Sequence, residues 1–145
     1  MPSVDRREVH LTIPVAPDME MAATAQVAAL GEWMDMGRDK IDEVKMAVVE
    51  ACINAFEHSH TPDRKVEISF RIGTEENGGR PYLEVDVSDA GRGFDPAKVD
   101  PPDLSRKLHA KSKRGWGIKI IESLMDDVRI ESGTNGTKIV MRKYR

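Results

Sequence analysis

Two alternating stretches on either side of a tight-turn signal constrain the fold of this chain more than any other feature. Residues 65–72 and 82–88 each alternate apolar and polar side chains, which is typical of strands with one buried face. The connection between them contains Asn77-Gly78, the strongest turn signal in the sequence. The sequence therefore predicts an antiparallel hairpin with one apolar face. Its buried positions are expected to be Val66, Ile68, Phe70, Ile72, Leu83, Val85 and Val87.

A strand and a helix are predicted before this hairpin. Alternation favours a half-buried strand over Val9–Val15, which prolines end. A helix is expected over Met19–Met34, with Asp18 as its N-cap. Met34 and Met36 fit either the core or an adaptable partner surface, and the core is the favoured use. The apolar stripe of this helix is predicted to consist of Met21, Ala25, Ala28, Ala29 and Trp33.

The next helix is amphipathic and carries the first candidate site. Asp39 is expected to cap it, and the turn at residues 61–63 follows it. On its polar face, Glu50 and Asn54 are one turn apart, so a carboxylate lies beside a carboxamide. Such a pair can serve as a base beside a metal ligand, but an ordinary solvated face is the favoured explanation of this helix when it is taken alone. The predicted apolar arc is Ile41, Val44, Val48, Val49, Cys52, Ile53 and Phe56.

Beyond the hairpin, periodicity fails from Asp89 to Gly117. A loop this long in a compact domain is a lid, a binding loop or a disordered segment. Helical patterning resumes over Ile118–Met125, and a closing hairpin over Val128–Glu131 and Lys138–Lys143 follows. No repeat or linker interrupts the chain, so residues 1–145 are expected to form one α/β domain. The third helix is predicted to bury Ile118, Ile121, Leu124 and Met125.

Composition narrows the range of functions. Lys plus Arg total 22 against 25 Asp plus Glu, and the net charge of −3 argues against a nucleic-acid-binding domain. The single cysteine, Cys52, is expected to be a buried thiol in a reducing compartment. No signal peptide or bilayer-length apolar run is present, so we expect a cytoplasmic protein without membrane partners. His58 and His60 lack a third ligand, which disfavours a zinc site.

Two glycine-rich stretches flank the irregular segment. Residues 89–94 (Asp-Ala-Gly-Arg-Gly-Phe) follow a strand, and an aspartate there can accept a hydrogen bond from an exocyclic amine such as that of adenine. Residues 114–117 (Arg-Gly-Trp-Gly) lead into the third helix, whose free N–H groups and dipole favour an anion. Lys111, Lys113 and Arg114 are placed to meet phosphates, but a solvated charge run explains them equally well.

Neither glycine stretch is sufficient evidence by itself. Residues 114–117 do not form the dinucleotide-binding fingerprint, because they follow an irregular loop and not a buried parallel strand. They also lack the Gly-Lys-Ser/Thr of a Walker-type loop. A third glycine signal, Gly136-Thr137, lies at the start of the last predicted strand and is also typical of an ordinary turn.

Taken in order, four motifs resemble the nucleotide-binding domain shared by gyrase, histidine kinases and MutL. Within that superfamily, the chain most resembles the anti-sigma factor serine kinases of the RsbW and SpoIIAB type, over roughly residues 8 to 143. The motifs are Glu50-x-x-x-Asn54-Ala55-x-x-His58, Asp89-x-Gly91-x-Gly93-Phe94, Gly115-x-Gly117-Ile118 and Gly136-Thr137.

The resemblance implies an α+β Bergerat (GHKL) fold, a two-layer sandwich with helices on one face of a mixed, mostly antiparallel sheet and with an ATP lid. Glu50 would be the general base on a serine hydroxyl, Asn54 would bind Mg²⁺ and Asp89 would recognise adenine. The residues that the resemblance assigns to ATP binding are Asn54, His58, Asp89, Gly91, Gly93, Phe94, Lys113, Arg114, Gly115, Trp116, Gly117, Ile118 and Thr137.

The function implied is that of an ATP-dependent protein-serine kinase and anti-sigma factor. Its partners would be a sigma factor and a STAS-type anti-sigma factor antagonist, which it would phosphorylate on serine, and it would form a homodimer. The alternative is a noncatalytic nucleotide-binding module that sequesters a partner. A histidine kinase catalytic half acting in trans is a third interpretation, whereas an ATPase of the gyrase type would need further domains.

Overall fold

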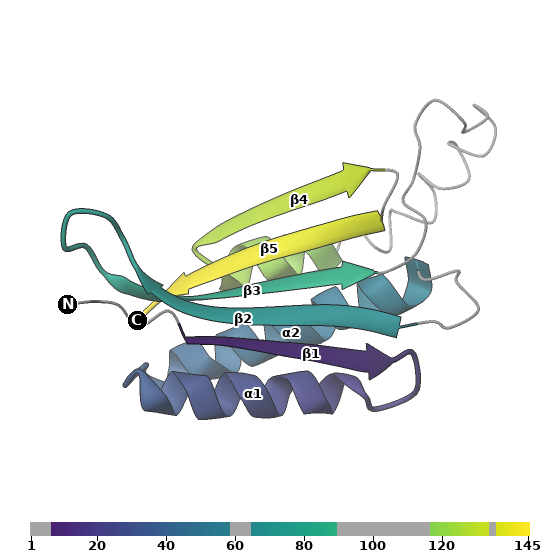
Figure 1. The fold of residues 1–145 in the computed structure, drawn as a ribbon, viewed down its shortest axis with the longest axis horizontal. Helices are drawn as coiled ribbons and strands as arrows, with labels where there is room; N and C mark the ends of the chain where they lie inside the picture. The colour runs from purple at the N-terminus through teal and green to yellow at the C-terminus, as the bar shows by residue number, and fades with distance from the viewer. Residues whose placement is uncertain (1–6, 59–64, 90–116, 134–135) are drawn as a thin grey trace.

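The computed structural model describes residues 7–58, 65–89, 117–133 and 136–145 as helices packed on one face of a five-stranded sheet (Figure 1). β1 (Arg7–Pro14) is followed by α1 (Glu20–Trp33) and α2 (Arg38–His58). β2 (Lys65–Thr74) and β3 (Pro81–Asp89) come next, and a helix over residues 117–124 precedes β4 (Asp127–Gly133) and β5 (Gly136–Tyr144). In these ranges, no helix is both long and apolar enough to cross a membrane.

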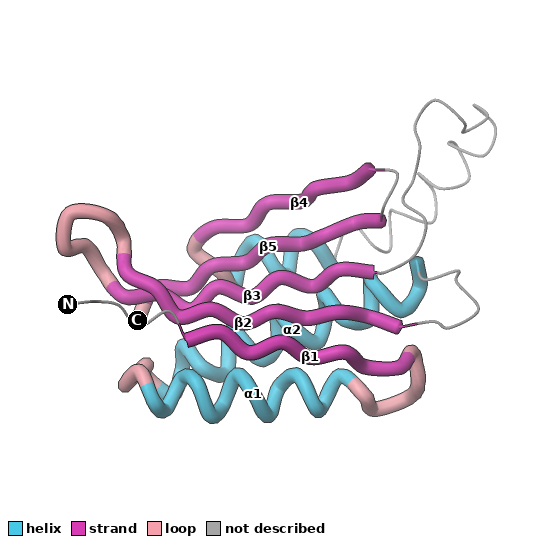
Figure 2. Tube along the Cα trace, viewed as in Figure 1, coloured by secondary structure: helices cyan, strands magenta, loops and turns pink. Residues whose placement is uncertain are grey.

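The strand order is β1-β2-β3-β5-β4, and the two-layer α+β class predicted from the sequence is confirmed (Figure 2). Every pair of neighbouring described strands is antiparallel. The expectation of a mixed sheet is therefore corrected for these strands. β3 and β4 do run in the same direction, but β5 lies between them and pairs with both.

The β2–β3 hairpin forms as its turn residues predict. Asn77 and Gly78 have φ angles of 64° and 75°, the left-handed conformation that a tight hairpin turn requires and that these two residues adopt at low cost. The turn is closed by the Glu75 N–H, which donates to the Arg80 carbonyl at 3.1 Å. The register places the predicted apolar positions of both strands on the face that the helices cover.

α2 supplies most of the helical layer and packs over β3. Ile41, Val44, Val48 and Cys52 of its predicted apolar arc are buried. The prediction is wrong for Ile53, which is 41% exposed. Small residues that a hydrophobicity pattern underweights take up the buried face between the large ones, namely Ala47, Ala51 and Ala55.

The buried stripe predicted for α1 is wrong. Met21 and Trp33 are 58% and 46% exposed, and Ala25 and Ala29 are also exposed. The contact with α2 is instead made through small residues, which allow a close approach of the two helices. A Cβ atom on Gly31 would lie only 2.6 Å from Cγ1 of Ile41, so this position needs glycine. The residues buried on α1 are Ala23, Thr24, Val27 and Gly31.

Both predicted helix caps are also wrong. The two methionines after α1, by contrast, lie in the core, which was the favoured prediction for them. Asp18 has a φ of 68° and precedes the N-cap position, which Met19 occupies without a side-chain hydrogen bond. Asp39 lies in the first turn of α2, where its charge favours the helix dipole but does not cap the helix. Met34 and Met36 are buried, which secures the connection between the helices.

The Cys52 thiol is fully buried, as predicted. Burial, with a smaller contribution from the charge of Glu20, raises its pKa from 9.0 to about 12. We therefore expect the native thiol to react with Ellman's reagent on the order of 10³-fold more slowly than the urea-unfolded chain. Because the folded pKa is the higher one, the linked stability is complete below pH 9 and is lost as the pH rises toward 12. Equal rates for the native and unfolded chain would contradict this burial.

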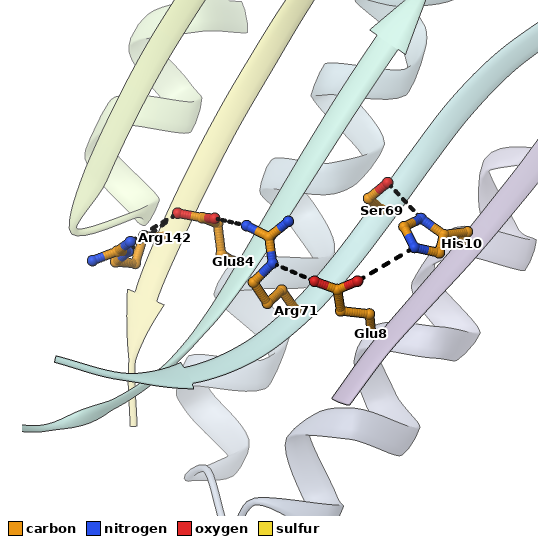
Figure 3. A network of polar contacts seen from close by, with 6 residues as sticks. All are labelled: Glu8, His10, Ser69, Arg71, Glu84 and Arg142. Carbon is orange, nitrogen blue, oxygen red and sulfur yellow. Dashed lines mark hydrogen bonds and ion pairs between the residues drawn. The ribbon is translucent and has the colours of Figure 1, made fainter. Parts of the chain in front are cut away.

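A row of alternating charges crosses the face of the sheet opposite the helices (Figure 3). Arg71 donates to Glu8 at 2.9 Å and to Glu84 at 3.0 Å, and Arg142 donates to the other oxygen of Glu84 at 3.0 Å. The Glu84 side chain is only 8% exposed, and these two guanidinium groups provide the hydrogen bonds that its carboxylate accepts there. The hydrogen bond and charge of Arg71 hold the pKa of Glu8 below its usual range. This row ties four strands together in register.

Replacing Glu84 with glutamine is expected to lower the free energy of unfolding by about 1–3 kcal/mol, because both arginines lose a charged acceptor. Urea unfolding measures the change. Glu67→Gln is the matched control, because Glu67 lies on the same strand face as Arg71 and is exposed. That control should stay within about 0.5 kcal/mol of the original protein. Equal effects of the two substitutions would show that the row does not stabilise the sheet.

Candidate nucleotide-binding site

The candidate site begins on the C-terminal half of α2, where Glu50 and Asn54 are one turn apart and both half-buried. The carboxylate of Glu50 lies against the start of the helix over residues 117–124. A Cβ atom on Gly117 would lie 3.4 Å from Oε2 of Glu50, which is an ordinary van der Waals distance, so the carboxylate lies close to this glycine. The positive end of that helix dipole is thus near the Glu50 charge. The structure brings the first and third motifs together.

Asp89, the last residue of β3, joins the second motif to the fourth. It continues the series of residues that point toward the helices, and it is only 4% exposed. Its Oδ1 accepts a hydrogen bond from the backbone N–H of Thr137 at 3.1 Å. This bond orients the carboxylate and fixes it to the start of β5. The Thr137 hydroxyl lies 3.2 Å from that of Ser132, across the β4–β5 hairpin.

These segments meet at one end of the molecule. Figure 1 shows the end of β3, the start of β5 and the C-terminal end of α2 at the same end of the sheet. Glu50, Asn54, Asp89, Gly117 and Thr137 therefore come from four separated parts of the chain. The resemblance to the nucleotide-binding domain implies such a convergence.

The structure does not place all of the predicted site residues. His58 is the last residue of α2, and Ile118 is half-buried against the core. The remaining predicted residues lie outside the described part of the chain, as does His60: Gly91, Gly93, Phe94, Lys113, Arg114, Gly115 and Trp116. Their assignment to ATP binding stays a prediction.

The residues present fit a magnesium-bound nucleotide better than a protein-built metal centre. Within the described ranges, no group of three or more His, Cys, Asp or Glu residues could hold a metal ion. Mg²⁺ bound to a nucleotide needs only one or two protein oxygens, because phosphates and water complete its coordination. The half-buried carboxamide of Asn54 offers such an oxygen donor beside the carboxylate of Glu50.

A hollow of about 470 Å³ beside the other face of α2 was not predicted from the sequence. It lies between the β1–α1 connection and α2, and Ile53 and Phe56 form its apolar wall while Asp18 and Glu20 supply acidic groups. None of the predicted site residues lines it. Ile53 is exposed because it lines this hollow. In the sequence, the only indication was that this apolar residue lies at the edge of the predicted arc.

The fold and the motif order define the class of protein. The family model described as a histidine kinase-like ATPase domain matches residues 13–143, which is nearly the whole chain. The matched region includes Glu50, Asn54, Asp89 and Thr137.

Relatives narrow this class. The serine-protein kinase RsbW of Bacillus velezensis and that of Bacillus subtilis are each 31% identical to this chain over 140 residues, covering 94% of the chain and 84% of the relative. RsbW of Oceanobacillus iheyensis is 28% identical over 140 residues, with 94% and 85% covered. The chain therefore belongs to the RsbW family of serine-protein kinases within the histidine kinase-like ATPases.

A solved structure agrees with the fold. The crystal structure of the RsbU and RsbW domains of a Mycobacterium tuberculosis protein superposes with a TM-score of 0.66 at 18% identity. The match covers 96% of this chain and 33% of that one. The similarity supports the arrangement of helices and strands described above.

Proposed function

We propose that this chain is an ATP-dependent serine kinase and anti-sigma factor that phosphorylates a serine of a STAS-type anti-sigma factor antagonist. The observation that carries the proposal is the closeness of the Glu50 carboxylate to Gly117, at the start of the helix over residues 117–124. A purely nucleotide-binding module needs a pocket but has no use for a carboxylate held beside an anion-binding helix start. The kinship with RsbW supports the same reaction.

Each residue of the candidate site then has a role. Glu50 accepts the proton of the serine hydroxyl as that oxygen attacks the γ-phosphorus of ATP, and ADP leaves with the electrons of the broken bond. The Asn54 carboxamide oxygen would hold Mg²⁺. When bound, the metal neutralises charge on the phosphates. Asp89, oriented by the Thr137 N–H, accepts a hydrogen bond from the adenine amino group.

The remaining predicted residues would act around the phosphates. Gly91, Gly93, Gly115 and Gly117 would let the backbone approach the nucleotide, and Lys113 and Arg114 would meet its negative charge. Phosphoryl transfer depends mostly on positioning and charge neutralisation, so these groups with Glu50 suffice for the reaction.

The partners and setting follow from the same proposal. The chain would bind a sigma factor in one state and its antagonist in the other, as a cytoplasmic homodimer. The net charge of −3 supports a protein partner over nucleic acid.

The deciding experiment is phosphate transfer. The purified chain is incubated with Mg²⁺, γ-labelled ATP and STAS-domain antagonists from the same organism, each paired with a variant whose acceptor serine is alanine. Label on the intact antagonist and none on its alanine variant supports the proposal. Tight ATP binding without label on any antagonist would contradict the kinase and favour the noncatalytic nucleotide-binding module. Acid-labile label on a histidine would indicate a histidine kinase.

A further inference from the structure

The helix over residues 117–124 is fixed at both ends by the same side of α2. Its first residue, Gly117, lies against Glu50, and its last residue, Leu124, lies beside the charged pair of Glu43 and Lys143. Glu43 and Glu50 are two turns apart on α2, a separation of about 10.5 Å along the helix axis. An eight-residue helix is about 12 Å long. The two glutamates of α2 therefore match the two ends of the shorter helix.

The contacts at Leu124 are made by one buried lysine. Nζ of Lys143 donates to the Leu124 carbonyl at 2.5 Å and to Oε2 of Glu43 at 2.8 Å, and the Lys143 side chain is only 9% exposed. Its positive charge lies at the negative end of the short helix, as Glu50 lies at the positive end. One ammonium group thus joins β5, α2 and the end of this helix.

The chain that follows the helix is also fastened to β5. The Asp126 N–H donates to the Arg142 carbonyl at 2.9 Å, and the Tyr144 N–H donates to Oδ2 of Asp126 at 2.7 Å. These bonds hold the beginning of β4, but none of them involves a residue of the helix itself. Among the polar side-chain contacts in the described ranges, the link between Leu124 and α2 passes through Lys143.

We propose that Lys143 is a positioning residue for the candidate active site. By holding Leu124 against Glu43, it sets how far the helix over residues 117–124 extends toward Glu50, and so where Gly117 meets the Glu50 carboxylate. Lys143 acts through this helix and contacts no substrate. The consequence for catalysis rests on the proposed kinase function, whereas the effect on Gly117 does not.

Stability alone does not require a lysine at this position. Buried ion pairs are often replaced by apolar residues of similar size at little cost to folding. Glu43 is 38% exposed at its side chain, so water can solvate its carboxylate when the lysine is removed. A methionine at position 143 is therefore expected to keep the fold while releasing the end of the helix.

The test compares Lys143→Met with Lys143→Arg and with the matched control Lys138→Met. Lys138 lies on β5 as well but on the opposite face of the sheet, so its removal takes away the same charge without touching Leu124. The readout is the pair of backbone amide NMR signals of Gly117 and Ile118 in nucleotide-free protein. We expect the chemical shifts of these signals to change in Lys143→Met and to be unchanged in Lys138→Met. In Lys143→Arg they should lie close to those of the original protein.

Catalysis is measured on the same variants. With a phosphate-accepting antagonist, Lys143→Met should lower kcat by about tenfold while KM for Mg·ATP changes less than about twofold, because the nucleotide contacts remain but the base is misplaced. A merely structural lysine would reduce the amount of folded protein and leave the kcat of the folded fraction unchanged.

Unmoved Gly117 and Ile118 signals in Lys143→Met would overturn the proposal, as would equal movement in Lys138→Met. If the single variant does not fold, the double variant Glu43→Met with Lys143→Met, which leaves no unpaired charge, is scored in the same way. A wild-type chain that transfers no phosphate would refute the proposed kinase function, but the amide signals would still decide the role of Lys143.

Discussion

Replacing Glu50 with glutamine is expected to slow phosphate transfer by about 10²–10⁴-fold, the usual contribution of a general base. Glutamine keeps the length of the side chain, so the contact with Gly117 is preserved while the proton acceptor is lost. The affinity for Mg·ATP should change by less than about threefold, because the nucleotide ligands proposed here are other residues. Single-turnover transfer to a STAS-type antagonist and a nucleotide titration measure the two effects.

Glu122→Gln is the control for this experiment. Glu122 is exposed on the helix over residues 117–124, so the substitution removes a charge from the same region without affecting the candidate base. Its transfer rate should match that of the original protein. A Glu50→Gln variant that transferred phosphate at the original rate would exclude Glu50 as the base and leave only a nucleotide-binding role for this helix face.

The second large effect is expected at Asn54. Asn54→Ala removes the proposed oxygen ligand of Mg²⁺, and we expect the Kd for Mg·ATP to rise by about 30- to 100-fold, corresponding to the loss of one charged contact. Asn54 is half-buried on the polar face of α2, so alanine should fit without disturbing the core. Isothermal titration calorimetry with ATP, once in Mg²⁺ and once in EDTA, measures the change in Kd.

The titration in EDTA identifies the cause. If Asn54 acts through the metal, metal-free ATP should bind the variant and the original protein almost equally. Gln26→Ala on α1, a half-buried amide away from the candidate site, should leave both affinities unchanged. If the Kd of Asn54→Ala for ATP rises as much in EDTA as it does in Mg²⁺, Asn54 contacts the nucleotide directly and not through the metal.

Local sequence signals predicted the strands well and the helix faces less well. Asn77-Gly78 specified its hairpin because few other residues adopt two successive left-handed conformations. The buried side of α1 was misassigned because Ala23 and Gly31 are inside for their small size, a property that emerges only when Ile41 of the neighbouring helix is in place. Hydrophobicity instead pointed to Met21 and Trp33, which face outward.

The candidate site could be anticipated from motif order but not its internal contacts. The one-turn spacing of Glu50 and Asn54 follows directly from helix geometry. The bond from the Thr137 N–H to Asp89 depends on β5 lying beside β3, which no local pattern reveals. Lys143 gave no signal at all, because it stands in a strand where alternation predicts only an orientation, and its partners Glu43 and Leu124 are distant in sequence.

The hydrogen bond between Asp89 and Thr137 has a consequence for the chain while it is being synthesised. It joins groups 48 residues apart, and it cannot form until the final strand has inserted between β3 and β4. Earlier portions of a growing chain already contain Glu50 and Asn54 but lack the bond that orients Asp89, the proposed adenine acceptor. With Asp89 in its proposed role, nucleotide capture should begin only after synthesis has passed β5, so that unfinished copies of the chain bind no ATP.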